Sequence, residues 1–176
     1  MNETTAEAII LAINALGAGV LLFVSGVAQK IMNDMDELAF KNFLNALGKA
    51  AMSDPFAVAI ATIPVFVVIF YFAAFGFNHG SFTAGIIVWM IAASITKVTN
   101  MPVYKWVGDP KNTDLEQLRR QRRKLQLGND WRAWLTLVSV VLMVCQFSVP
   151  GAILAVVACV VIAPPSLWLA RKYMPK

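Results

Sequence analysis

Long uncharged stretches dominate this sequence and limit the folds that are open to it. Residues 8–29, 55–96 and 133–170 contain no Asp, Glu, Lys or Arg. A helix of about 20 predominantly apolar residues crosses a hydrocarbon core of about 30 Å. A helix also pairs its own backbone polar groups, which is necessary in a bilayer interior that offers no water. The pattern therefore predicts an all-α fold, a polytopic membrane helix bundle.

Composition and charge support the same class of protein. The chain has 176 residues, of which 59% are apolar and 14% charged, outside the usual range of soluble domains. Apolar segments recur with short polar connections between them, so we expect a single transmembrane domain over residues 1–176. Most basic residues behind the net charge of +5 lie between or beside these segments, where membrane topology explains them. The expected partner is a lipid bilayer, and no nucleic acid.

Five membrane spans fit the apolar segments, at about 8–29, 55–77, 82–104, 132–148 and 151–170. As one helix, residues 133–170 would be about 57 Å long, which is too long for a single crossing. Pro150-Gly151 marks a turn that divides this stretch. The prediction is a four-helix core plus a fifth helix. Pro164 and Pro165 should kink or end that fifth helix, because proline lacks a backbone donor.

The positions of lysine and arginine predict the orientation of the chain. With five spans and the N-terminus outside, every Lys and Arg between or after the spans falls on the inner side. We therefore expect a multi-pass integral membrane protein with a cytoplasmic C-terminus. The two inner loops carry capping signals and apolar residues at helical spacing, which predict inner amphipathic helices at about 35–47 and 114–127.

The second of these helices carries a group of basic residues: Arg119, Arg120, Arg122, Arg123 and Lys124. One interpretation is contact with anionic lipid headgroups or with an acidic partner, to which each basic residue near the surface would contribute about 1 kcal/mol. The other interpretation is that these residues only enforce topology. The sequence leaves both open.

Few polar side chains occur within or beside the spans, and they are the candidates for chemistry, because burying them costs free energy unless they are used or paired. Lys97 and Asn100 share one helical face, and Asn129 and Arg132 enter the fourth span at the same level. If the third and fourth spans are antiparallel neighbours, these four residues converge with Gln29. We take Lys97, Asn100, Asn129 and Arg132 as candidate catalytic residues.

Structural roles for the same residues remain open alternatives. Lys97 lies close enough to the inner boundary to extend its ammonium group toward water. Asn129 fits the N-cap of the fourth span, and Arg132 fits a topology anchor.

No recognisable metal or cofactor motif is present in the sequence. His79 is the only histidine, and Cys145 and Cys159 fall within apolar stretches at different expected depths. Neither the ligand spacing of a zinc, copper or haem site nor a phosphate-binding glycine loop or dithiol motif can be found. We therefore expect no cofactor and no metal.

Several short motifs resemble a known family. A glycine-rich first span, Thr96–Pro102 at the end of the third span and Asn129-Asp130-Trp131-Arg132 at the start of the fourth are similar to the anthrone oxygenase-like family of small membrane proteins, otherwise a domain of unknown function. The resemblance covers roughly residues 10–145, and its most specific marks are Asn100-x-Pro102 and Asn129-x-x-Arg132. The chain departs from the pattern at Tyr104, where the family usually has a second asparagine, and in the segment after Pro150.

The resemblance implies oxygenation of an acidic C–H group in a polycyclic anthrone without metal or flavin. Such chemistry needs a base and donors that hold the resulting oxyanion. Arg132, Asn100 and Asn129 are the candidate donors, and the ligand that the resemblance implies is a lipophilic aromatic molecule. The base is the missing part, because Lys97 would have to be buried and Asp130 would need access to the same pocket. The alternative function is a non-enzymatic accessory or scaffold subunit that contacts a membrane-protein partner or forms a homo-oligomer.

Overall fold

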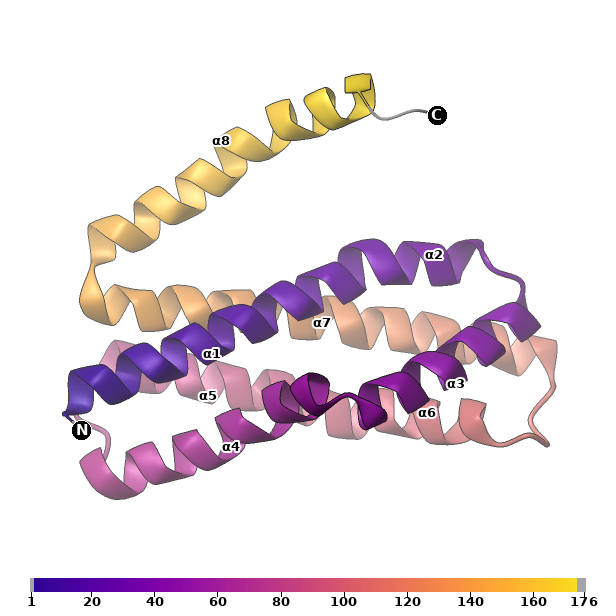
Figure 1. The fold of residues 1–176 in the computed structure, drawn as a ribbon, viewed down its shortest axis with the longest axis horizontal. Helices are drawn as coiled ribbons and strands as arrows, with labels where there is room; N and C mark the ends of the chain where they lie inside the picture. Colours follow the sequence, from indigo (N-terminus) through magenta and orange to yellow (C-terminus); the bar gives the residue numbers. More distant parts are fainter. Residues whose placement is uncertain (1, 174–176) are drawn as a thin grey trace.

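The computed structural model describes residues 2–173 as a set of long helices with short connections (Figure 1). No strand occurs among these residues, and five of the helical segments are long and apolar enough to cross a membrane. The predicted all-α membrane helix bundle is therefore confirmed. In chain order the elements are α1 (Glu3–Phe23), a first π-turn (Val24–Ala28), α2 (Gln29–Asp34), α3 (Glu37–Ser53), α4 (Pro55–Phe75), α5 (Gly80–Ile95), a second π-turn (Thr96–Asn100), α6 (Met101–Gly108), α7 (Leu115–Phe147) and α8 (Val149–Tyr173).

Local capping chemistry explains where several helices begin. The Asp54 side chain accepts a hydrogen bond from the Ala57 amide at 2.7 Å, and Pro55 occupies the first position of α4. Asp36 caps α3 and Asp114 caps α7 in the same way. Gly76 ends α4 with φ at 74°, a backbone conformation that favours glycine.

The two ends of the bundle have separate hydrophobic cores. We call the end with the N-terminus and the α4–α5 connection the N-terminal end, and the opposite end, which carries the α2–α3 and α6–α7 connections, the basic end (Figure 1). The N-terminal core consists of Ala6, Ile10, Val68, Tyr71, Phe82, Ile86 and Met143. The core of the basic end consists of Met32, Phe40, Leu44, Val103, Val107, Leu118 and Leu125. Which end faces the cytoplasm remains the prediction made from charge.

The structure joins two predicted elements into one. The amphipathic helix at 114–127 and the span at 132–148 form a single helix, α7, of 33 residues. Such a helix is about 50 Å long, longer than the hydrocarbon core of about 30 Å, and its first half packs with α2, α3 and α6. Gly128 does not end the helix, because a mid-helix glycine costs only about 1 kcal/mol and this one is buried in packing. α3 likewise continues past Gly48 to Ser53.

The predicted fifth helix is present but lies apart from the other four. α8 continues through Pro164 and Pro165, so the prolines do not end it. Ala152 is buried close to the turn, whereas residues 153–169 are all exposed. α8 contacts α7 near the turn and then diverges from it (Figure 1). The architecture is thus a four-helix core with one outlying apolar helix.

Candidate functional site

A chain of hydrogen-bonded amide side chains links α2 and α7 to the second π-turn. Asn100 donates to Asn129 at 2.7 Å, and Asn129 donates to Gln29 at 3.1 Å. Gln29 donates to Asn33 at 3.0 Å, and Asn33 donates to Gln126 at 3.2 Å. The first three residues are at most 1% exposed, while the last bond lies at the surface. The chain therefore runs from the interior of the bundle to the surface of the basic end.

Two π-turns position the buried part of this amide chain. Val24–Ala28 immediately precedes Gln29, and Thr96–Asn100 ends on Asn100 itself. A π-turn contains one more residue than an α-turn, so it rotates the residues beside it relative to a regular helix, and such turns occur frequently at functional sites. Pro102 lies two residues after Asn100 and cannot donate to the carbonyl of Val98, which removes one α-helical bond there.

A glycine on α7 makes room for the asparagine pair. A Cβ atom on Gly128 would lie 2.1 Å from Asn100 Oδ1 and 3.0 Å from Thr99 Cγ2. Asn100 Oδ1 is itself buried and has no hydrogen-bond partner among the described residues. The close approach of the two helices at this level therefore depends on the missing side chain at Gly128.

An apolar cavity of about 620 Å³ lies beside the amide chain, between α1, α4, α5 and α7. This volume is within the range of small-molecule sites, about 300–1,000 Å³. Polar groups in its lining are restricted to Thr96, Arg132 and Thr136. The full lining is Gly17, Val20, Leu21, Phe56, Ala57, Ile60, Ala61, Trp89, Ala92, Ala93, Thr96, Met101, Arg132 and Thr136.

Arg132 is the charged residue of this cavity. No carboxylate forms an ion pair with it within residues 2–173. Thr136 lies one turn further along α7, and its hydroxyl donates back to the Arg132 carbonyl at 2.7 Å. Since that hydroxyl proton is already used, the Arg132 guanidinium, with five N–H donors, is the strongest hydrogen-bond donor of the lining.

The structure separates the four candidate catalytic residues. Asn100 and Asn129 bond to each other, and Gln29 joins them, but these three are not part of the cavity lining. Arg132 lines the cavity. Lys97 is exposed on the surface of the bundle. The alternative of an N-cap role for Asn129 is wrong, because this residue lies in the interior of α7.

Asp130, the acidic residue next to Asn129, also accepts a hydrogen bond. The Ser25 hydroxyl, from the first π-turn, donates to Asp130 Oδ1. This bond joins α7 to the first π-turn. Asp130 is not a cavity-lining residue.

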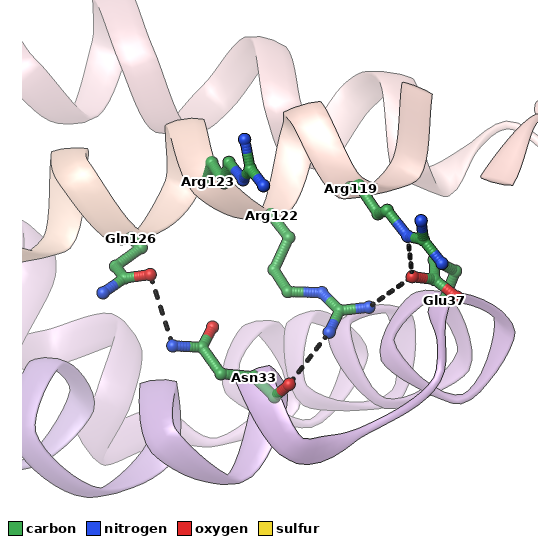
Figure 2. Close-up of a pocket in the computed structure, with 6 residues that line it drawn as sticks. All are labelled: Asn33, Glu37, Arg119, Arg122, Arg123 and Gln126. Carbon is green, nitrogen blue, oxygen red and sulfur yellow. Dashed lines mark hydrogen bonds and ion pairs between the residues drawn. The ribbon is translucent and has the colours of Figure 1, made fainter. Parts of the chain in front are cut away.

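A second, polar pocket of about 270 Å³ lies at the surface of the basic end, where Figure 2 shows it between α7 and the α2–α3 region. Arg122 lies deepest among its arginines, with 12% of its side chain exposed. It donates to the carbonyls of Asn33 at 3.2 Å and Met35 at 2.8 Å, and it stacks 4.9 Å from the centre of the Phe40 ring. Arg122 therefore fastens α7 to the end of α2.

The other basic residues of α7 differ in their surroundings. Arg119 donates to Glu37 at 2.5 Å, and this hydrogen bond is the main reason why the pKa of Glu37 is lowered. Arg120 pairs with Glu116 one turn away at 2.5 Å, with both side chains exposed. Arg123 and Lys124 are exposed and form no ion pair within residues 2–173. Contact with lipid headgroups or an acidic partner, a role predicted for all five, remains a prediction.

Sequence reasoning missed Asn33 and Gln126 as members of the amide chain. A signal existed, because Asn33 lies four residues after Gln29 and Gln126 lies three residues before Asn129, so each pair shares a helical face. The cavity had no comparable signal, since its lining comes from four separated segments. Comparisons with protein-family models, curated proteins and solved structures found no match.

Proposed function

We propose that this membrane helix bundle binds a lipophilic small molecule that carries an anionic oxygen group, and that Arg132 contacts that group. The observation that carries the proposal is a guanidinium without a carboxylate partner in the lining of an otherwise apolar cavity. A charged side chain among apolar helices is costly unless it is paired or used. An anionic ligand group would offset this cost through charge-assisted hydrogen bonds.

The surroundings of the cavity also support a ligand that arrives from the bilayer. Val20, Phe56 and Met101 line the cavity and are at the same time 47%, 64% and 58% exposed on the bundle surface. A lipophilic molecule dissolved in the membrane therefore meets these side chains first. Trp89 offers an aromatic surface further along the lining, which suits a planar aromatic ligand.

A matched pair of probes tests the proposal. Anthracene carboxylate should bind the purified protein in nanodiscs, measured by probe fluorescence anisotropy, and should bind better than the neutral anthracene carboxamide. Arg132→Gln should weaken carboxylate binding by about ten- to hundredfold, because a hydrogen bond to a charged group contributes about 1.5–3 kcal/mol. Carboxamide binding should change much less.

Lys97→Gln is the control for this experiment, since it removes the same charge from an exposed residue outside the cavity. Ala61→Phe, which fills the cavity without a change of charge, should weaken both probes. Equal carboxylate affinity in the parent and the Arg132→Gln variant would contradict the proposal. So would binding that empty nanodiscs reproduce.

An anthrone oxygenase-like activity is the second candidate function. It rests on the resemblance of the short motifs and on a cavity whose size and lipophilic character suit a polycyclic aromatic molecule. Arg132 would hold the oxyanion. The cavity lining contains no side chain of base type, so ligand binding has the stronger support. Oxygen uptake with an anthrone, present in the parent and lost in Arg132→Gln, would support this activity, and no uptake by the parent would contradict it.

A further inference from the structure

Three potential metal ligands come together at the N-terminal end, opposite the cavity and the basic pocket. Glu3, Glu7 and His79 each place one ligand atom in a group whose members all lie within 4.8 Å of one another. His79 Nδ1 lies 2.6 Å from Glu7 Oε1 and 3.8 Å from Glu3 Oε1. In a tetrahedral zinc site with bonds of about 2.0–2.1 Å, neighbouring ligand atoms are about 3.3 Å apart. Small side-chain shifts would bring the three atoms to that spacing.

Two separate parts of the chain supply these ligands. Glu3 and Glu7 lie one turn apart at the start of α1 and so share a helical face. His79 lies in the connection between α4 and α5, which Gly76 turns back toward α1 with its φ of 74°. A metal ion bound here would tie the first turns of α1 to this connection.

A buried tyrosine orients the carboxylates from a third direction. The Tyr71 hydroxyl, from α4, lies 3.0 Å from Glu7 Oε1 and 3.4 Å from Glu3 Oε1. Tyr71 is 1% exposed, and its ring packs against the rings of Phe72, Phe75 and Phe82 at centroid distances of 5.4–5.6 Å. A rigid hydrogen-bond donor behind metal ligands is the usual outer support of a metal site.

The charge of the cluster also favours a cation. Glu7 is 1% exposed, and a buried carboxylate is costly unless an opposite charge compensates it. None of the fifteen Lys and Arg residues occurs within residues 1–29, 50–96 or 133–170, the segments that form this end.

We propose that Glu3, Glu7 and His79 bind a divalent first-row transition-metal ion such as Zn²⁺, with Tyr71 as a positioning residue. Imidazole together with carboxylates is a donor set typical of zinc and related ions, and three protein ligands leave a position for water. The sequence predicts no metal because it offers neither a second histidine nor a cysteine close to His79. In the structure two glutamates of α1 take the place of such a ligand. They lie far from His79 in the sequence, so residue spacing does not reveal the cluster.

Calorimetric titration of metal-free protein with ZnCl₂ tests the site. The full chain would be purified with an affinity tag that contains no histidine, on a Cys145→Ala, Cys159→Ala background that removes competing thiols. The parent should bind one Zn²⁺ per chain with a dissociation constant in the micromolar range or below. His79→Ala should weaken binding by a hundredfold or more, and Tyr71→Phe by about tenfold.

Glu3→Gln is a second test variant in case His79→Ala fails to fold. The Glu3 side chain is 25% exposed and the substitution is conservative, so this variant should fold. It should weaken zinc binding while the helical content is retained. Ser81→Ala, close to His79 but bonded to Gln146, is the matched control and should bind zinc like the parent.

Three results would overturn the proposal: no stoichiometric zinc binding by the parent, unchanged binding in folded His79→Ala and Glu3→Gln variants, or displacement of zinc by millimolar Mg²⁺. The first two would leave the cluster as a hydrogen-bonded group of His79, Glu7 and Tyr71. The third would indicate attraction of any cation by the carboxylates. Probe binding at Arg132 uses neither these residues nor a metal, so each proposal can fail independently of the other.

Discussion

Arg119 and Arg122 lie three residues apart on α7 and share the face directed toward α2 and α3, where both meet Glu37. Arg120 and Arg123 lie on a different face and are exposed. Neighbouring arginines in the basic part of α7 therefore have different surroundings and different roles. Position around the helix determines that Arg119 and Arg122 contact α3, whereas Arg120 pairs within α7 and Arg123 forms no ion pair among the described residues.

The Glu37–Arg119 pair predicts a dependence of stability on pH. Because Arg119 lowers the pKa of Glu37 below its ordinary value of 4.5, the pair stabilises the fold fully above that value. This contribution is lost as the pH falls through the lowered pKa. The melting temperature of the parent should therefore exceed that of Glu37→Gln at neutral pH, and the difference should shrink in acid.

Glu116→Gln is the matched control, since it removes a carboxylate from an ion pair whose two side chains are both largely exposed. Exposed pairs of this kind contribute little to stability. Its effect on the melting temperature at neutral pH should be the smaller of the two. A difference between the parent and Glu37→Gln that stays constant from neutral to acidic pH would contradict the prediction.

At the scale of elements, the two π-turns and Gly128 determine how α1, α6 and α7 meet. The π-turns direct Gln29 and Asn100 toward α7, and Gly128 lets the Asn100 side chain approach the α7 backbone. The amide chain and the close helix contact therefore depend on each other. A change at either should disturb both.

Gly128→Ala tests this dependence. Its new Cβ would lie 2.1 Å from Asn100 Oδ1, and moving Asn100 would break its bond to Asn129. We expect the free energy of unfolding to fall by about 1–3 kcal/mol, as in other overpacked interiors. Unfolding by SDS in mixed micelles measures this change.

Gly19→Ala is the control on α1, because a Cβ there meets no atom within 4 Å. Alanine is better than glycine within a helix by up to about 1 kcal/mol, so this variant should be neutral or slightly more stable than the parent. A Gly128→Ala variant that gains stability in the same way would show that the contact at Gly128 is not tight.

The whole molecule consists of a four-helix core, an extension of that core at the basic end, and α8. α8 makes its buried contact near Ala152 and leaves residues 153–169 exposed, an apolar surface for the bilayer. The core therefore holds together through contacts in which most of α8 takes no part.

A chain that ends at Ser148 should consequently keep the four-helix core. Its melting temperature in micelles should lie within about 4 °C of the parent, which corresponds to a change of about 1 kcal/mol for a protein of this size. A chain that ends at Val140 is the control, since it lacks Met143 of the N-terminal core, and it should fail to fold. Loss of the folded state in the chain that ends at Ser148 would show that α8 supports the core.

The class of fold follows from the amino-acid sequence alone, because an uncharged stretch long enough to cross a bilayer must satisfy its backbone as a helix wherever it packs. It also indicated Asn100, Asn129 and Arg132 as candidates, since amide and charged groups near apolar helices are rare. Which of these side chains lie together became clear only from the packing of the helices. Contacts between Asn100 and Asn129, or between Glu7 and His79, depend on how separate helices are rotated, and the two π-turns and Gly76 set part of that rotation. Residue spacing along one helix carries no information on the rotation of its neighbour.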